Sequence, residues 1–278
     1  MNCNVKIIET KNYLTKSNLP ASDYVINPYV GCPHGCKYCY ACFMKRFTGH
    51  SEPWGSFIDI KQCSRPIDVK KLTGKTVFLS SVTDCYNPYE ETYKMTQGIL
   101  QQLISTDCQV SISTKSKLIL RDLPLLKQLK NLSVSISINT LDESFRSDMD
   151  SASTIAERIE TLITLYNHGI HTVLFMSPIF PGITDFKAIL EETKDYIHEA
   201  WFENLNLRGS YRQTIISYIN THYPTLSSLY QEIYQKKSTT YWEQLSNEID
   251  QYCSTHKISY TNYFYHEKLV SQKMQSQT

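Results

Sequence analysis

Short apolar segments alternate with amphipathic segments along most of the chain. Six segments rich in Val, Ile and Phe have the length and composition of β-strands, at residues 24–30, 76–82, 108–114, 132–139, 171–178 and 201–207. Four stretches between them place apolar side chains at helical intervals, at residues 90–104, 118–129, 155–167 and 185–198. This alternation predicts an α/β fold with a parallel sheet and right-handed crossovers. Six units are too few for a closed eight-stranded barrel, so we expect a partial parallel (β/α)6 barrel.

The pattern changes after Arg208. Residues 209–278 contain 10 of the 20 tyrosines, and they include two helix-like stretches, a third at residues 239–256 and a short strand-like segment at 258–264. We therefore predict three segments: an N-terminal lead-in at 1–23, the barrel core at 24–208 and a mostly helical, Tyr-rich C-terminal extension at 209–278. Tyrosines at helical spacing are more typical of half-buried packing than of base stacking, although stacking is the alternative.

Composition narrows the class of protein. A hydrophobic content of 41% with 20% charged residues is typical of a globular chain and excludes a disordered one. No apolar run approaches the roughly 18 residues of a membrane span, and the first residues lack the apolar stretch of a secretory signal. We therefore expect a cytoplasmic protein without a membrane partner. In that compartment the clustering of three of the nine cysteines indicates metal binding rather than disulfides.

Charge is balanced overall but not locally. The net charge of +1 gives no global signal for binding a polyanion. Residues 32–75, however, contain eight Lys and Arg against three Asp and Glu, a local charge of +5. Such a field near an active site suits a nucleic acid or another anionic substrate. The alternative is a solvated face that partly compensates an anionic metal cluster.

The cysteines of the sequence GCPHGCKYC carry the strongest chemical signal. Cys32, Cys36 and Cys39 form a C-x3-C-x2-C motif just after the first predicted strand, and the neighbouring glycines permit the tight turns that bring three thiolates together. A zinc site would need a fourth ligand, which His34 or Cys42 could supply. An iron–sulfur cube is normally held by four cysteines, so three would leave one iron open. We expect Cys42 to be a small buried residue of the following helix, and His34 to face solvent or the second layer of side chains around the metal.

This motif in this place resembles the radical SAM superfamily. Residues 27–46 and the later motifs SVTDCYNP, STKS, SVSISINTLDE and SPIFPGITD resemble its spore photoproduct lyase branch, in particular the uncharacterised group called radical SAM mobile pair protein B. The resemblance covers residues 24–208. It implies that Cys32, Cys36 and Cys39 hold a [4Fe–4S] cluster whose open iron binds S-adenosylmethionine. It also implies reductive cleavage to a 5′-deoxyadenosyl radical, with a flavodoxin- or ferredoxin-type electron donor.

Sites in parallel α/β barrels lie at the carboxyl ends of the strands. The resemblance assigns cofactor contacts to Tyr38, Thr83, Lys115 and Ser137. Asn139, near the end of the fourth strand, and Arg158, on the helix that follows it, are further candidates for binding the cofactor. The alternatives are a solvated strand end for Lys115, a barrel-filling residue for Ser137 and an ordinary surface charge for Arg158.

One departure from the family pattern concerns hydrogen donation. By this resemblance, the hydrogen-donor cysteine of spore photoproduct lyases aligns with Ser81, which has no thiol. The nearest thiol in this chain is that of Cys85. Cys85 is therefore the candidate catalytic residue, and lyase activity on thymine photoproducts is doubtful. We expect a radical SAM enzyme acting on nucleic acid. The alternatives are a radical enzyme that modifies peptides or proteins and a non-catalytic zinc or iron–sulfur module.

Overall fold

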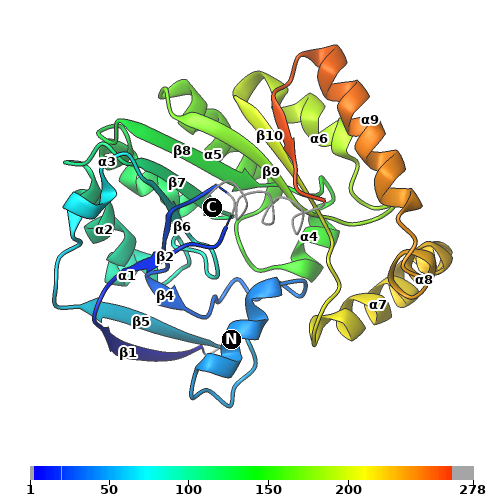
Figure 1. Cartoon of the computed structure of the whole chain (residues 1–278). Helices are drawn as coiled ribbons and strands as arrows, with labels where there is room; N and C mark the ends of the chain where they lie inside the picture. Colours follow the sequence, from blue (N-terminus) through cyan, green and yellow to red (C-terminus); the bar gives the residue numbers. More distant parts are fainter. Residues whose placement is uncertain (1–2, 20, 265–278) are drawn as a thin grey trace, which may run out of the picture.

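The computed structural model describes residues 3–19 and 21–264, and its main feature is an eight-stranded sheet in the order β11-β10-β9-β8-β7-β6-β3-β2 (Figure 1). All neighbouring strands run parallel except β2, which pairs antiparallel with β3 at one edge. The bounds are β2 Leu14–Lys16, β3 Tyr24–Ile26, β6 Thr76–Leu79, β7 Gln109–Thr114, β8 Asn131–Ser137, β9 His171–Ile179, β10 Glu199–Asn204 and β11 Tyr260–Asn262. The six predicted core strands lie side by side in chain order, which confirms the partial parallel barrel.

The first predicted strand was wrong in one respect, because residues 24–30 form two strands in different sheets. Pro28 has no N–H to donate to a ladder, so β3 ends at Ile26 and the chain changes direction. β4 (Tyr29–Val30) then pairs antiparallel with β5 (Phe57–Cys63), which pairs parallel with β1 (Asn4–Thr10). This small sheet was not predicted.

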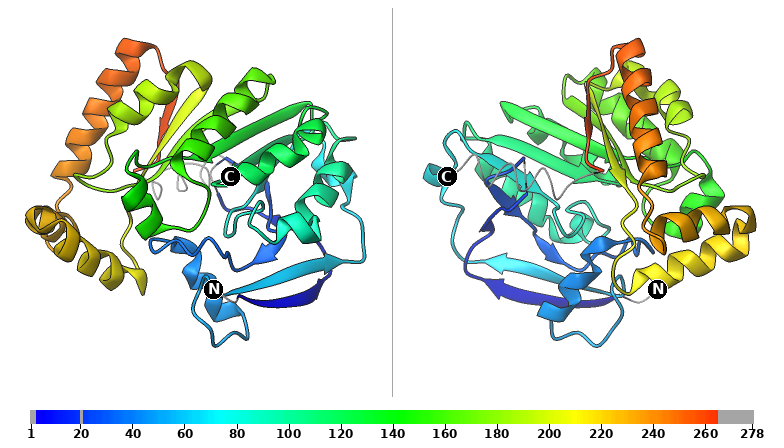
Figure 2. Two further views of the ribbon diagram at one scale, coloured as in Figure 1. Left: turned by 180° about the vertical axis from the view of Figure 1, so that it is seen from behind. Right: turned by 45° about the vertical axis from the view of Figure 1, so that its right-hand side comes forward.

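The helices between the barrel strands are close to those predicted, with more breaks. Their bounds are η1 Tyr40–Phe47, η2 Val69–Leu72, α1 Glu90–Tyr93, α2 Met95–Leu103, η3 Lys117–Asp122, α3 Leu123–Leu126, α4 Glu143–Met149, α5 Ile155–Asn167, α6 Phe186–Thr193 and η4 Lys194–Tyr196, where η marks a 3₁₀ helix. The expected helix at 90–104 is broken at Lys94, which adopts a left-handed φ of 52°. α5 begins and ends as predicted, and a capping box between Thr154 and Glu157 defines its start. The left view of Figure 2 shows α5 and α6 lying across one face of the sheet.

The C-terminal extension is helical and then returns to the sheet. It contains α7 (Tyr211–His222), η5 (Pro224–Leu226), α8 (Ser227–Tyr234) and α9 (Thr240–His256), after which β11 pairs with β10. Residues 265–278 of the predicted extension lie outside the described residues. Every helix among the described residues is too short or too polar to span a membrane.

Two hydrophobic clusters matter for the site. The larger lies between the sheet and its helices, where Leu79 of β6, Ile112 of β7 and Leu174 of β9 are fully buried. The smaller joins Tyr38 to Phe145 and Phe180 and to buried side chains of α7 and α8. Tyr230 of α8 is 1% exposed in this cluster, so tyrosines of the extension do pack as core residues.

Candidate active site

Residues 31–39, which we call the cluster loop, follow β4 and carry the three motif cysteines. Gly31 has a φ of +87°, and a Cβ atom there would lie 2.3 Å from the carbonyl oxygen of Phe57 in β5, so only glycine fits. Two tight turns follow, in which Gly35 N–H donates to Cys32 O at 3.2 Å and Cys39 N–H donates to Cys36 O at 3.1 Å. These turns place three free, partly buried thiols on one loop.

Three free thiols on one loop are a donor set of the kind that holds an iron–sulfur cube. Within the part of the chain that the structure describes, no three His, Cys, Asp or Glu side chains are close enough to hold one ion. A cube does not require such convergence, because each thiolate binds a different iron. The loop carries three thiols that fit this arrangement.

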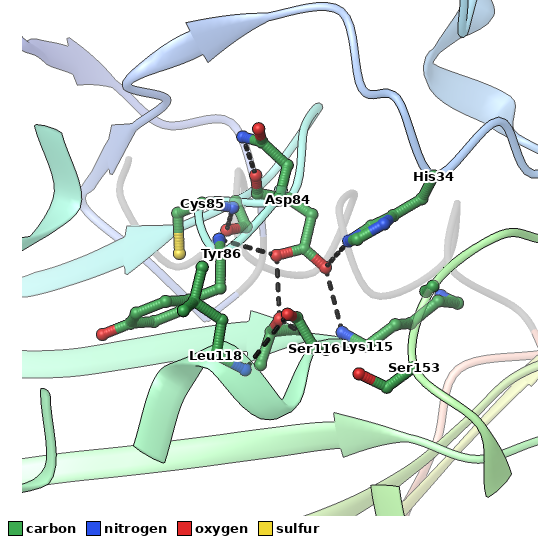
Figure 3. A network of polar contacts seen from close by, with 12 residues as sticks. His34, Asp84, Cys85, Tyr86, Lys115, Ser116, Leu118 and Ser153 are labelled. Atoms are coloured by element: carbon green, nitrogen blue, oxygen red, sulfur yellow. Dashed lines mark hydrogen bonds and ion pairs between the residues drawn. The ribbon is translucent and has the colours of Figure 1, made fainter. Parts of the chain in front are cut away.

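A buried carboxylate, Asp84, ties the cluster loop to the barrel (Figure 3). Its Oδ1 accepts hydrogen bonds from Thr114 Oγ1 and from the Tyr86 N–H, both at 2.8 Å. Its Oδ2 accepts the Lys115 N–H at 2.9 Å and lies 3.3 Å from His34 Nε2. Burial opposes ionisation, but His34 and these donors outweigh it and lower the pKa of Asp84 to about 2. His34 is only 3% exposed, so it does not face solvent.

A second buried carboxylate, Asp150, joins the loop to β8 and α5. It forms an ion pair with Arg158, and its Oδ2 accepts a hydrogen bond from the Tyr38 hydroxyl at 3.0 Å. Arg158 also donates to the carbonyl oxygen of Ser137, at the end of β8. Burial raises the pKa of Asp150, but the charges of Arg158 and Lys115 outweigh this and lower it. Arg158 is 1% exposed, so the alternative of an ordinary surface charge was wrong.

Lys115 follows β7 directly, and its ammonium lies beside the cluster loop. The Nζ atom is 5.8 Å from the centroid of the Tyr38 ring. Burial raises the pKa of the Cys36 thiol to about 12, and the charge of Lys115 is the strongest effect that opposes this rise. Among the described residues this ammonium has no hydrogen-bond or ion-pair partner. It is a cation held next to the thiols and available to an anionic ligand.

The remaining candidates lie at the same end of the sheet but are engaged differently. Thr83 Oγ1 donates to Gly31 O at 2.7 Å and so holds the cluster loop. Asn139 Nδ2 donates to Pro178 O at 3.1 Å, which ties the end of β8 to β9. Ser137, the last residue of β8, is 3% exposed. The assignment of these side chains to a cofactor stays a prediction.

Two further cysteines differ from the motif cysteines. Cys85 is fully buried in the larger hydrophobic cluster, and Figure 3 shows its sulfur directed away from His34 and Lys115. This position favours packing, and hydrogen donation by Cys85 stays a prediction. Cys42 is partly exposed rather than buried as expected, with its sulfur 3.9 Å from Ser210 Oγ at the start of the extension.

Asp84 and Asp150 are the two site residues that were missed. Asp84 lies in the quoted motif SVTDCYNP, and a carboxylate just past a strand end is the signal that could have found it. Asp150 gives no comparable signal, because its importance depends on the buried Arg158.

Comparison with known proteins identifies the family. The family model described as the Radical SAM superfamily matches residues 26–194. The chain belongs to the radical SAM superfamily. It is therefore a radical SAM enzyme, and this superfamily uses a [4Fe–4S] cluster together with S-adenosylmethionine. Membership of the mobile pair protein B group stays a prediction.

Relatives by sequence are uncharacterised, and relatives by structure share the fold. An uncharacterised protein of Methanocaldococcus jannaschii is 38% identical over 81% of this chain and 86% of its own. One of Mycobacterium bovis is 27% identical over 77% of this chain and 67% of its own. Spore photoproduct lyase complexed with dinucleoside spore photoproduct matches with a TM-score of 0.58 at 13% identity, over 79% of this chain and 66% of that one. SuiB of Streptococcus suis bound to S-adenosylmethionine matches with a TM-score of 0.54 at 11% identity, over 94% of this chain and 51% of that one.

Proposed function

We propose that this radical SAM enzyme acts on a nucleic acid, with Cys32, Cys36 and Cys39 holding its cluster and Lys115 holding S-adenosylmethionine. The observation that carries the cofactor assignment is the unpaired Lys115 ammonium beside the three-thiol loop. An ammonium offers three donors to the carboxylate or the ribose of the cofactor. Thr83, Ser137, Asn139 and Arg158 complete the proposed pocket at the carboxyl ends of the strands.

When bound, the cluster would be held by Cys32, Cys36 and Cys39 and would supply the electron for reductive cleavage of S-adenosylmethionine. The chain itself contributes position and shielding. Asp84 holds the backbone of Lys115, and therefore directs its side chain, through the 2.9 Å hydrogen bond to its N–H. Tyr38 packs edge-on against Phe180 at 5.5 Å, and the two buried rings form an apolar wall beside the loop.

Two observations support the substrate class, and a third distinguishes the reaction from that of the lyase. Residues 32–75, which include most of the cluster loop and the segment after it, carry the local charge of +5. The fold is similar to that of spore photoproduct lyase, whose solved complex holds a dinucleoside spore photoproduct. Ser81 stands where that lyase aligns a donor thiol, and Cys85 is buried in the core. We therefore infer a nucleic-acid modification or repair that differs from photoproduct cleavage.

The proposal also covers electron supply and compartment. All nine cysteines are free, which suits a reducing compartment, and we place the enzyme in the cytoplasm. A flavodoxin- or ferredoxin-type protein would reduce the cluster there.

The test is anaerobic turnover of reconstituted protein with dithionite and S-adenosylmethionine. We expect 5′-deoxyadenosine to form, and to form faster with single-stranded DNA or RNA than with a peptide mixture. Stimulation by peptides alone would favour a peptide-modifying enzyme. Protein that contains zinc, and neither iron nor the visible absorbance of a cube, would contradict the assignment of the cluster to these cysteines.

A further inference from the structure

Exposed aromatic side chains gather on η1, the helix that begins directly after Cys39. Of the six large hydrophobic side chains that are exposed among the described residues, three lie here: Tyr40 at 55%, Phe43 at 42% and Phe47 at 67% exposure. Exposed apolar groups that cluster in this way mark an interaction site more often than an ordinary surface. Because η1 begins directly after Cys39, these rings lie close to the cysteines that we propose hold the cluster.

The same helix carries cations and no acids. The Arg46 guanidinium lies over the rings of Phe43 and Phe47, with its carbon 5.5 and 4.7 Å from their centroids. Lys45 Nζ donates to the carbonyl oxygen of Ser51 at 2.9 Å, which keeps its charge at the end of the helix. No Asp or Glu occurs anywhere in residues 24–51. The charge of Glu203 acts on Tyr40, whose hydroxyl donates to the Ser81 carbonyl oxygen, so the positive part of the aromatic surface is the end that carries Phe43, Arg46 and Phe47.

A second acid-free segment, residues 204–231, meets η1 from the other end of the chain. The Cys42 sulfur lies 3.9 Å from Ser210 Oγ, and Lys37 Nζ lies 5.6 Å from the centroid of the Tyr218 ring. Figures 1 and 2 show the start of α7 beside η1 in every view. The nearby carboxylate of Asp148 already accepts a hydrogen bond from the Tyr218 hydroxyl at 2.6 Å. The two segments together contribute four cations to this surface, Lys37, Lys45, Arg46 and Arg212, beside Arg208, which already has a partner.

We propose that η1 and the start of α7 form the docking face for a single-stranded nucleic acid. This rests on the proposed nucleic-acid substrate and adds how that substrate is held. Exposed rings stack with bases of any sequence, while neighbouring cations bind the phosphates. A duplex keeps its bases stacked internally, so it can offer phosphates to the cations but no base faces to the rings. An acidic protein would also pair with the cations, yet it would leave the three rings without flat partners.

The experiment is fluorescence anisotropy of a labelled oligothymidylate with the anaerobic, cluster-loaded protein. The double variant Phe43→Ala/Phe47→Ala should bind it at least about 10-fold more weakly than wild type, since each stacked base contributes strongly to binding. Arg46→Gln should flatten the dependence of log affinity on log salt by about 0.7, the value for one lost phosphate contact on a single strand. Tyr166→Ala and Lys127→Gln are matched controls, because they remove an exposed ring of α5 and an exposed charge just after α3, and they should change nothing.

Iron content and dithionite-driven cleavage of S-adenosylmethionine are measured on the same samples. Both should match wild type in all four variants, which shows that a loss of binding is not a loss of folding. Wild-type affinity in the double variant would overturn the docking face while leaving a nucleic-acid substrate standing. The docking face would also be overturned if the double variant bound the oligonucleotide normally and only its reduction by a flavodoxin became slower. The face would then bind the electron donor. If wild type itself binds no oligonucleotide, the proposed substrate class fails together with its docking face.

Discussion

At the scale of single residues, the proposed site separates the thiols expected to hold a cluster from the ammonium expected to hold its ligand. Three thiols lie on the cluster loop, while the Lys115 ammonium reaches them from the end of β7. Asp84 connects the two, because it accepts the Lys115 N–H and lies 3.3 Å from His34 of the loop. Variants of the thiols and of Lys115 should therefore have different consequences.

The cysteines give the first prediction. Cys32→Ala, Cys36→Ala and Cys39→Ala should each lose most of the bound iron and all cleavage of S-adenosylmethionine, because a cube held by two thiolates is open to solvent. Cys42→Ala is the matched control, since its partly exposed sulfur lies beside Ser210, and it should keep both. Iron is measured after anaerobic reconstitution. If Cys42→Ala loses iron as the others do, four thiolates hold the cluster and no iron is left open.

Lys115 gives the second prediction. Lys115→Ala should weaken S-adenosylmethionine binding about 10- to 100-fold with unchanged iron, because a charge-assisted hydrogen bond contributes roughly 1.5–3 kcal/mol. Lys115→Arg should rescue only in part, since a planar guanidinium does not superpose on an ammonium. The control is Lys117→Ala, which removes an exposed lysine paired with Glu157. Anaerobic titration calorimetry measures the affinity, and wild-type binding in Lys115→Ala would remove this side chain from the site.

At the scale of elements, the small sheet supports the cluster loop. β4 leads into the loop, and β5 lies so close to Gly31 that no Cβ atom can be accommodated. Trp54, which precedes β5, stacks edge-on against Phe57 at 5.7 Å. The small sheet, which includes the N-terminal strand β1, therefore fixes the path of the loop that we propose holds the cluster.

Gly31 gives the third prediction. Gly31→Ala should lower both the free energy of unfolding and the iron content, because it combines a left-handed φ of +87° with a Cβ atom 2.3 Å from Phe57 O. Gly74→Ala is a matched control, with a φ of +64° and no neighbouring atom within 4 Å. It should cost only the roughly 1–2 kcal/mol of the left-handed conformation. Urea unfolding compares the two, and equal losses would show that β5 does not constrain the loop.

At the scale of the whole molecule, one buried ion pair connects three parts of the chain. Arg158 of α5 contacts the end of β8, and Asp150 contacts Tyr38 in the cluster loop. Both side chains of the pair are 1% exposed. A buried charge left without its partner is costly, so the pair makes the loop and the barrel interdependent.

This pair gives the fourth prediction. Arg158→Met should reduce the free energy of unfolding by about 3–5 kcal/mol, because it leaves the Asp150 carboxylate buried and unpaired. Adding Asp150→Asn should recover part of that loss. The control is Lys187→Met, whose half-exposed pair with Glu248 should contribute no more than about 1 kcal/mol. Urea unfolding of the apoprotein measures all of these, and a loss as small as the control's would show that the pair is not a structural link.

Local spacing was enough to predict much of the fold. The α5 segment at 155–167 shows a helical period along its whole length, and five of the six core strands were placed to within about three residues at each end. The cysteine motif likewise depends only on spacing along a few residues, so it could be identified before any tertiary structure was known. The small sheet could not, because β1 and β5 pair across more than fifty residues of chain.

The sequence by itself determined the order of the barrel strands, the helical extension, the three motif cysteines and the family they indicate. Tertiary structure decided which polar groups are buried and with what partners. Asp84 meets Thr114 and Lys115 from another strand, and Arg158 is buried because Asp150 lies opposite it. It also brought two acid-free segments together at Cys42 and Ser210. The reason is physical: period and spacing record local geometry, whereas burial and charge pairing depend on segments that meet only after the chain has folded.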